Sequence, residues 1–122
     1  MKHTTKSNED YLETILKLET NGSVKSVLIA NALDVSKAAV SVAMKELIER
    51  NLIKKEIYGD IQLTPQGRKI AKGIQEKHTL IKKLLVAIGV SEATAEIECC
   101  KIEHILSEET VKCLKNIEKK ID

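Results

Sequence analysis

Residues 24–50 read VKSVLIANALDVSKAAVSVAMKELIER, a short helical segment and a longer one separated by a turn. The first segment runs from Val24 to Leu33, and Asp34-Val35 supplies the turn. Ser36 is placed to cap the second segment, which runs to about Arg50. Apolar side chains recur on one side of this second segment: Val40, Ala43, Met44, Leu47 and Ile48. A short helix, a tight turn and a longer helix predict a helix-turn-helix.

The flanking segments extend this motif to a winged fold. Ser7-Asn8-Glu9-Asp10 has the form of a capping box and predicts a helix that ends at Asn21-Gly22. Leu52 to Ile57 and Ile61 to Leu63 predict two strands joined by a turn at Tyr58-Gly59-Asp60. This hairpin would be the wing. The first helix of the helix-turn-helix has apolar residues at Val27, Leu28 and Ala32.

Three more helices are expected after the hairpin. Thr64 caps a long helix that has Pro65 at its first position and reaches Gly89. Ser91 caps a helix to about Leu106, and Ser107-Glu108 opens a last helix. The long helix carries an apolar stripe formed by Ile70, Ile74, Ile81 and Leu85. The natural division of the chain falls near Lys72, inside this long helix.

Composition limits the size of the core. The 122 residues are 43% hydrophobic but contain no Trp or Phe and only two Tyr, so the core is built from small aliphatic side chains. Burying more apolar surface in a homodimer would stabilise such a chain. Three cysteines, two of them adjacent, cannot form a paired disulfide framework, so we expect reduced thiols. The start, MKHTT, lacks the apolar region of a signal peptide, and no run approaches the roughly eighteen apolar residues of a membrane span; we expect a cytoplasmic protein without membrane association.

Charge is unevenly placed along the chain. Residues 35–83 carry eleven Lys or Arg against five Asp or Glu, whereas residues 91–122 carry five against eight. The basic part could face phosphates and the acidic part could face cations. Solvated helix faces that happen to segregate would give the same pattern.

The second helix of the helix-turn-helix has short or basic side chains opposite its apolar side: Ser36, Lys37, Ala38, Ser41, Val42 and Lys45. A helix that enters the major groove needs short side chains for base edges and lysines for phosphates. The wing adds Lys54, Lys55 and Tyr58, placed to meet the backbone or the minor groove. These residues predict a surface for double-stranded DNA, although winged folds also serve in protein contacts and the hairpin could be merely polar.

The run Cys100-Lys101-Ile102-Glu103-His104 is the clearest chemical signal. On a helix, Cys100, Glu103 and His104 stand on one face, so a thiolate, a carboxylate and an imidazole converge within one turn. That is half of a transition-metal site. Glu96 shares this face. Cys99 and Cys113 lie among apolar residues and are assigned to packing.

Two other helices contribute candidate ligands. Asp10 and Glu13, three residues apart, repel each other unless a cation lies between them, although Asp10 could serve only in the helix cap. His78 lies on or beside the apolar stripe of the long helix, where a hydrogen-bonded core histidine is the alternative.

Several strings resemble the diphtheria toxin repressor family of iron- and manganese-dependent transcriptional regulators. They are NEDYLETI at 8–15, KHTL at 77–80, CKIEHILS at 100–107 and the LTPQGR junction at 63–68. The resemblance covers almost the whole chain in the expected order. It implies a mainly α fold: a winged helix-turn-helix DNA-binding domain over residues 1–71, an all-helical metal-binding and dimerisation domain over residues 72–122, and a metal site between them.

By this resemblance, metal-binding positions of one or another branch of the family fall on Asp10, Glu13, His78, Cys100, Glu103 and His104. Asp10 and Glu13 look like the manganese-responsive branch, whereas Cys100 looks like the iron-responsive branch. Glu96 falls where the iron branch places a second-site histidine, and Lys82 falls where that branch has a carboxylate. Lys82 therefore argues against an iron-type second site, and Cys100 argues against a manganese-type binuclear site.

Taken together, the residues and the resemblance predict a repressor that binds a palindromic operator as a homodimer when loaded with a divalent transition metal, and so controls metal homeostasis. Fe²⁺ and Mn²⁺ are favoured, and Co²⁺ and Zn²⁺ also suit the donors. The main alternative is a metal-independent winged-helix regulator that senses a small molecule or thiol oxidation at Cys99-Cys100. A small metalloenzyme is disfavoured because six ligands leave no open coordination position. A purely structural module would show no salt-dependent DNA binding.

Overall fold

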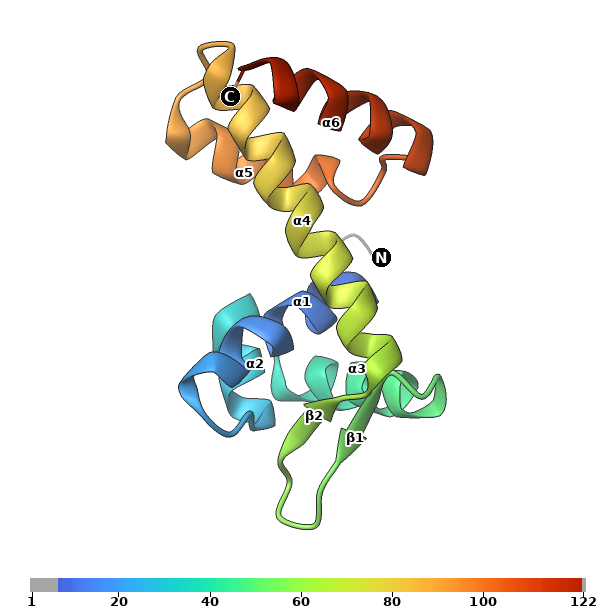
Figure 1. Ribbon diagram of the computed structural model, residues 1–122. Helices are drawn as coiled ribbons and strands as arrows, with labels where there is room; N and C mark the ends of the chain where they lie inside the picture. Colours follow the sequence, from blue (N-terminus) through green and yellow to red (C-terminus); the bar gives the residue numbers. More distant parts are fainter. Residues whose placement is uncertain (1–6, 122) are drawn as a thin grey trace. The chain divides into compact units, whose positions relative to one another are not determined.

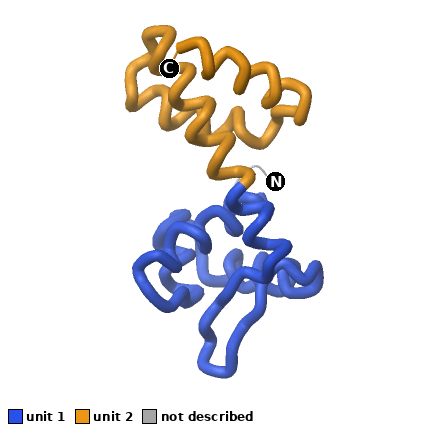
Figure 2. The backbone as a smooth tube through the Cα atoms, in the orientation of Figure 1, with its two compact units in different colours: residues 1–72 blue, residues 73–122 orange. Residues whose placement is uncertain are grey.

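A computed structural model describes residues 7–121 of the chain (Figure 1). The backbone contacts divide the chain into two compact units, residues 1–72 and residues 73–122 (Figure 2). The long helix α4, Pro65–Ala87, begins in the first unit and ends in the second. Among residues 7–121 the secondary structure is helical apart from one two-stranded hairpin, so the mainly α winged fold class predicted from the sequence is confirmed.

The first unit contains, in order, α1 (Asn8–Leu18), the short 3-10 helix η2 (Glu19–Asn21), α2 (Ser26–Leu33), α3 (Lys37–Glu49), β1 (Ile53–Lys55) and β2 (Ile61–Leu63). Two of its helices begin at predicted caps. The Ser7 hydroxyl accepts a hydrogen bond from the Asp10 amide at 3.2 Å, and Ser36 accepts one from the Ala39 amide at 3.0 Å. Asp34 adopts the left-handed conformation, φ 54°, and ends α2, as the predicted tight turn requires.

The core of the first unit is formed by aliphatic residues and Tyr11. α2 buries Ile29 and Ala30, whereas Val27 and Leu28 are 44% and 41% exposed and Ala32 is exposed as well. The sequence of α2, SVLIANAL, is apolar on nearly every side. Its periodicity therefore does not determine which face packs, and contacts with α1 and α3 decide it.

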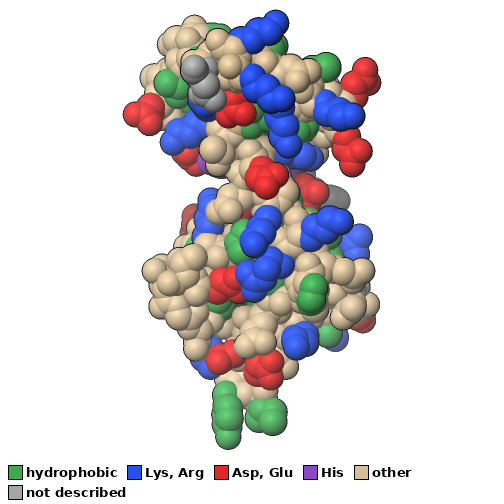
Figure 3. All heavy atoms as spheres, in the orientation of Figure 1, with side chains coloured by type: hydrophobic (Ala, Val, Ile, Leu, Met, Phe, Trp, Pro, Cys, Tyr) green, Lys and Arg blue, Asp and Glu red, His purple; other side chains and the backbone are tan. Residues whose placement is uncertain are grey.

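The wing is shorter than predicted. β1 and β2 pair antiparallel with Ile53 opposite Leu63, but β1 ends at Lys55 and does not reach Ile57. The loop beyond Lys55 closes on itself, because the Glu56 amide donates to the Asp60 carbonyl at 2.7 Å. Apolar side chains protrude at the tip of the hairpin (Figure 3), where both Ile57 and Tyr58 are strongly exposed.

The start of α4 is tied to the base of the wing. The Thr64 hydroxyl accepts a hydrogen bond from the Gly67 amide at 3.0 Å, which confirms Thr64 as the cap before Pro65. A Cβ atom at Gly67 would overlap the backbone oxygen of Leu52, so this close approach requires glycine.

The second unit consists of the later turns of α4 with α5 (Glu92–Ile102) and α6 (Glu108–Ile121). Ser91 and Ser107 cap α5 and α6 as predicted. The predicted end of α5 near Leu106 is wrong: the helix ends at Ile102, with Glu103 as its C-cap, and His104 lies in the following turn. An N-cap residue has non-helical dihedral angles, so α5 must end before Ser107.

No single helix among the described residues is long and apolar enough to cross a membrane. Taken together, α2 and α3 reach the required length and composition, but the pair is bent by 114°.

Candidate metal centre

His78 on α4 lies between two carboxylates in the second unit. Its Nε2 is 3.0 Å from Oε2 of Glu96 on α5, and its Nδ1 is 2.9 Å from Oε1 of Glu103. A neutral imidazole can donate from only one nitrogen. With a neutral ring, one of the two carboxylates therefore faces a ring nitrogen that has no proton to donate, and a cation bound there would contact both groups.

The two adjacent cysteines differ in environment. Cys99 Sγ is 3.5 Å from both ring nitrogens of His78 and is buried, whereas Cys100 is exposed. Cys100 Sγ is 3.9 Å from His78 Nδ1 and 3.8 Å from Glu96 Oε2. Sequence reasoning missed the contact of Cys99 with His78, since the apolar neighbours of Cys99 indicated packing alone.

Burial raises the pKa of the Cys99 thiol to about 12, and the nearby Cys100, Glu96 and Glu103 raise it as well. This thiol is protonated at neutral pH, and it lies 3.3 Å from the backbone oxygen of Glu96. Because a metal ion takes the thiolate form, the environment favours Cys100 over Cys99 as a ligand.

Lys82, one turn after His78 on α4, pairs with Glu96. Its Nζ is 3.0 Å from Glu96 Oε1. The hydrogen bond from Lys82 holds the pKa of Glu96 below its usual range, although burial acts in the opposite direction. The same bond raises the pKa of Lys82. Glu96 is therefore ionised, with one oxygen bound to Lys82 and the other toward His78.

Glu103 lies between two imidazoles. Besides His78 Nδ1, the Nε2 of His104 is 3.5 Å from Glu103 Oε2. Although α5 ends before both residues, the turn at its end brings the His104 ring to the Glu103 carboxylate. Glu103 and His104 thus lie close together, as the sequence predicted. A turn brings them together, and not the shared helical face that we expected.

The first unit holds the remaining predicted ligands, Asp10 and Glu13, both on α1. Glu13 is buried, and its Oε2 is 3.6 Å from Nζ of Lys17. Participation of Asp10 and Glu13 in a metal site stays a prediction.

The residues of the second unit fit a divalent transition metal. One ligand atom from each of His78, Glu96, Cys99 and Cys100 lies within 4.8 Å of the others. Ligand atoms that share one ion at bond lengths of roughly 2.0–2.3 Å are separated by distances of this size. Imidazole nitrogen, thiolate sulfur and carboxylate oxygen are donors for iron, cobalt, zinc and manganese, whereas calcium and magnesium prefer oxygen alone.

A second surface of interest lies on α3 in the first unit. The six residues predicted to face DNA are exposed: Ser36, Lys37, Ala38, Ser41, Val42 and Lys45. A groove of about 330 Å³ lies here, and its lining includes Lys37, Ser41 and Lys45 of α3 and Lys55 of β1. Ser36 uses its hydroxyl as the helix cap, so it has less freedom to contact a base than Ser41.

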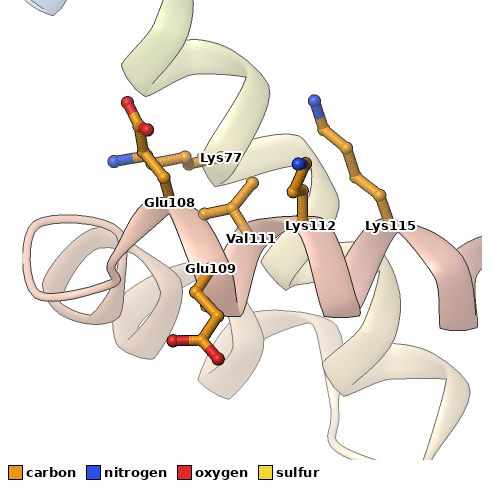
Figure 4. A pocket seen from close by; sticks show the side chains of 6 residues that line it. All are labelled: Lys77, Glu108, Glu109, Val111, Lys112 and Lys115. Carbon is orange, nitrogen blue, oxygen red and sulfur yellow. The ribbon is translucent and has the colours of Figure 1, made fainter.

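A larger groove, of about 510 Å³, lies between α4 and α6 in the second unit (Figure 4). It is lined by Lys77, Glu108, Glu109, Val111, Lys112 and Lys115. Lys112 and Lys115 extend from α6 in the same direction. None of the predicted site residues lines this groove.

Comparison with known proteins decides the family. Residues 3–61 match the family model described as iron dependent repressor, N-terminal DNA binding domain. Residues 64–122 match the one described as iron dependent repressor, metal binding and dimerisation domain. The chain belongs to the iron-dependent repressor family. The resemblance to the diphtheria toxin repressor family is thereby confirmed, and this family member is a metal-dependent transcriptional regulator that uses a divalent transition metal.

Relatives support the same assignment. An uncharacterised HTH-type transcriptional regulator of Methanocaldococcus jannaschii is 40% identical over 114 residues, 91% of each chain. The HTH-type transcriptional regulator MntR of Geobacillus kaustophilus is 36% identical over 84% of this repressor-family chain and 74% of its own length. The manganese regulator SloR has a solved structure with TM-score 0.84 and 29% identity, covering 95% of this chain. The chain spans about half the length of SloR, 55%.

Proposed function

We propose that this family member is a repressor that binds a palindromic DNA operator as a homodimer when a divalent transition metal is bound. The observation that carries the proposal is the cluster of His78, Glu96, Cys100 and Glu103, whose carboxylates surround one imidazole. Metal binding would neutralise this cluster, and its binding free energy would shift the protein toward the state that binds DNA. The metal thus acts as an allosteric ligand.

The proposed ligands are His78, Glu96, Cys100, Glu103 and His104, together with Asp10 and Glu13. The last two rest on the resemblance and on the repulsion of carboxylates three residues apart on α1. The relatives MntR and SloR are a transcriptional regulator and a manganese regulator, and ScaR has been solved with Zn²⁺ and with Cd²⁺. Because Cys100 supplies a soft sulfur, we propose Fe²⁺ as well as Mn²⁺ as the natural activator, with Co²⁺ and Zn²⁺ also able to bind.

DNA binding is proposed for residues 1–71. Lys37 and Lys45 would contact phosphates, and Ser41 and Val42 would contact base edges in the major groove. Tyr58 of the wing would reach the backbone or the minor groove. These side chains are exposed, and the lysines among them supply positive charge.

Dimerisation is proposed for residues 72–122. Several large aliphatic side chains of the second unit are exposed in the single chain: Ile88 at 78%, Ile105 at 79%, Ile97 and Ile117. A second copy could cover such side chains. Two copies would place two recognition helices in half-sites about one helical turn, ~34 Å, apart.

The test starts with duplexes selected by the metal-loaded protein from a random library. Binding to the selected duplex is then measured by fluorescence anisotropy with Mn²⁺, anaerobic Fe²⁺, Co²⁺, Zn²⁺ or chelator. We expect the wild type to bind the duplex tightly only with metal. His104→Ala should lose this metal-dependent DNA binding, and Lys112→Ala, a substitution outside the cluster, should bind DNA as wild type does. Sedimentation should give a dimer. DNA binding that chelator leaves unchanged, or that responds only to a thiol oxidant, would overturn the proposal.

A further inference from the structure

We propose that Lys25 is a positioning residue that fixes the tip of the wing, the loop of residues 56–60, for contact with DNA. This inference rests on the proposed DNA binding of residues 1–71. Lys25 lies directly before α2, and its Nζ donates a hydrogen bond to the backbone oxygen of Tyr58 at 2.8 Å. The same Nζ is 2.5 Å from Oδ1 of Asp60. One ammonium group thus holds the loop at two points.

The strands of the wing are too short to set the direction of this loop. β1 and β2 have three residues each, and a two-stranded hairpin is marginally stable at best by itself. Inside the loop, the Gly59 amide donates to the Glu56 oxygen at 2.9 Å, a bond that joins the loop to itself. The Ile61 amide donates to the Val24 oxygen at 2.9 Å. Val24 and Lys25 therefore tie the wing to the rest of the first unit at the start of β2 and at the tip.

The tip carries the side chains that a fixed loop would present. Ile57 and Tyr58 are 93% and 87% exposed, and Figure 1 shows the loop between β1 and β2 extending beyond the helices of the first unit. Apolar side chains contact the minor groove in proteins that bind it. Lys25 binds the backbone oxygen of Tyr58 and leaves its ring exposed for such a contact.

The anchor lies beside the surface proposed for DNA. Ser26, the residue after Lys25, lines the same groove as Lys37 and Ser41 of α3, and Lys55 at the end of β1 lines it as well. A tip held next to this groove would reach DNA close to α3 in one direction. A free tip would have to be ordered on binding, at a cost in affinity.

Two double variants separate the position of the tip from its charge. Lys25→Met/Asp60→Asn, the anchor variant, removes one positive and one negative charge and keeps the net charge of the chain. The two side chains are 44% and 33% exposed, so these substitutions do not open the core. Ile57→Ser/Tyr58→Ser, the tip variant, removes the two apolar side chains and keeps the backbone oxygen that Lys25 binds. Lys37→Met is the control for a direct phosphate contact.

The first measurement needs no DNA. The chain has no Trp or Phe, and of its two tyrosines Tyr11 is buried, so chymotrypsin should cut the folded protein first after Tyr58. Cleavage of a native protein follows the population of the locally open form. The anchor variant should be cut roughly tenfold faster than wild type, and Lys37→Met at the wild-type rate. Mass spectrometry identifies the fragments, and circular dichroism melts check that each variant folds.

The second measurement is binding of the selected duplex at several salt concentrations, with the metal that activates wild type most strongly. The anchor variant should bind roughly tenfold more weakly with the wild-type salt slope, whereas Lys37→Met should reduce that slope by about 0.9. In the tip variant, adding the anchor substitutions should weaken binding by less than about twofold, because the contacts that the anchor positions are already gone.

An equal loss in both backgrounds, a reduced salt slope in the anchor variant, or unchanged cleavage after Tyr58 would overturn this inference and leave the proposed function intact. A tip variant that binds DNA as wild type does would overturn it as well. If no metal makes wild type bind a duplex, the proposed function fails together with the inference. If the anchor variant does not fold, Lys25→Met alone decides by the same comparison.

Discussion

Glu103 Oε1 lies 2.9 Å from Nδ1 of His78, and the Glu103 side chain is only 1% exposed. A carboxylate buried to this degree is costly unless a cation or hydrogen-bond donors offset its charge. Within the second unit, the pair joins α4 to the end of α5. The same two groups thus hold the second unit together and form part of the proposed metal site.

Removing His78 should therefore destabilise the metal-free protein. In His78→Ala, the buried Glu103 carboxylate loses its contact with the imidazole at 2.9 Å, and the unfolding free energy in chelator should fall by about 3 kcal/mol. In Glu103→Gln, no charge remains to be compensated, so stability should change by less than about 1 kcal/mol while metal affinity falls. Urea unfolding and metal titration measure the two effects.

The double variant His78→Ala/Glu103→Gln is the control for this prediction. It should recover most of the stability lost in His78→Ala, because the uncompensated charge is gone. Equal losses in the single and double variants would show that packing of the ring, and not its contact with Glu103, explains the effect.

Local signals in the sequence predicted much of the fold. Ser7, Ser36, Thr64 and Ser91 each form the expected cap, because a cap depends on a few neighbouring residues. The buried face of α2 could not be read from its sequence and the end of α5 was predicted wrongly, since both depend on packing between segments distant in the sequence. Patterns of neighbouring residues do not predict such contacts.

In the candidate site too, local spacing predicted some contacts, whereas contacts between helices were missed. The proximity of Glu103 and His104 followed from spacing, even though α5 ends before both, whereas Cys100 lies with His78, Glu96 and Cys99. The contact of Cys99 with His78, at 3.5 Å, could not be predicted because it joins two helices. The resemblance indicated that Lys82 departs from the iron branch, but its bond to Glu96 required the structure.

The three cysteines should react differently with iodoacetamide. In the native metal-free protein at neutral pH, Cys100 and Cys113 are exposed and should be alkylated, whereas the buried, protonated Cys99 should resist. Metal should protect Cys100 and leave Cys113 reactive, as peptide mass spectrometry would show. All three should react in denaturant. Native labelling of Cys99 as fast as Cys100 would contradict the assignment of Cys99 to packing.

The metal-free protein should lose stability at alkaline pH. The pKa of the Cys99 thiol is raised from 9.0 to about 12, so the folded state holds this proton more tightly than the unfolded state. The stabilisation is complete below about pH 9 and is lost as pH rises toward 12, with a slope for this thiol of up to about 1.4 kcal/mol per pH unit. Burial also raises the pKa of Tyr11, which acts in the same direction.

Urea unfolding in chelator at several pH values between 8 and 10.5 measures this effect. Cys99→Ala lacks the thiol and should show a shallower decline, with only the contribution of Tyr11 and other groups remaining. Identical slopes in wild type and Cys99→Ala would mean that Cys99 does not titrate as its environment indicates.

Lysines of α3 should govern the salt dependence of DNA binding. Lys37→Ala or Lys45→Ala should weaken binding to all sequences and reduce the slope of log K against log salt by about 0.9, the value for one phosphate contact. Ser41→Ala and Val42→Ala should instead change which duplexes are selected. If the lysine variants altered sequence preference with an unchanged salt slope, these roles would be reversed.

Substituting Cys100 should change which metal activates DNA binding. The sulfur of Cys100 lies 3.8 Å from Glu96 Oε2 and is the soft donor we propose in the site. In Cys100→Glu all ligands become nitrogen or oxygen, so the affinity for Co²⁺, Zn²⁺ and Fe²⁺ should fall relative to that for Mn²⁺, by roughly tenfold or more. Isothermal titration with each metal, and anisotropy with the selected duplex, measure the change. Cys113→Ala, a substitution of the other exposed cysteine, should leave the order of metal affinities as in wild type. An unchanged order in Cys100→Glu would place the sulfur of Cys100 outside the coordination shell.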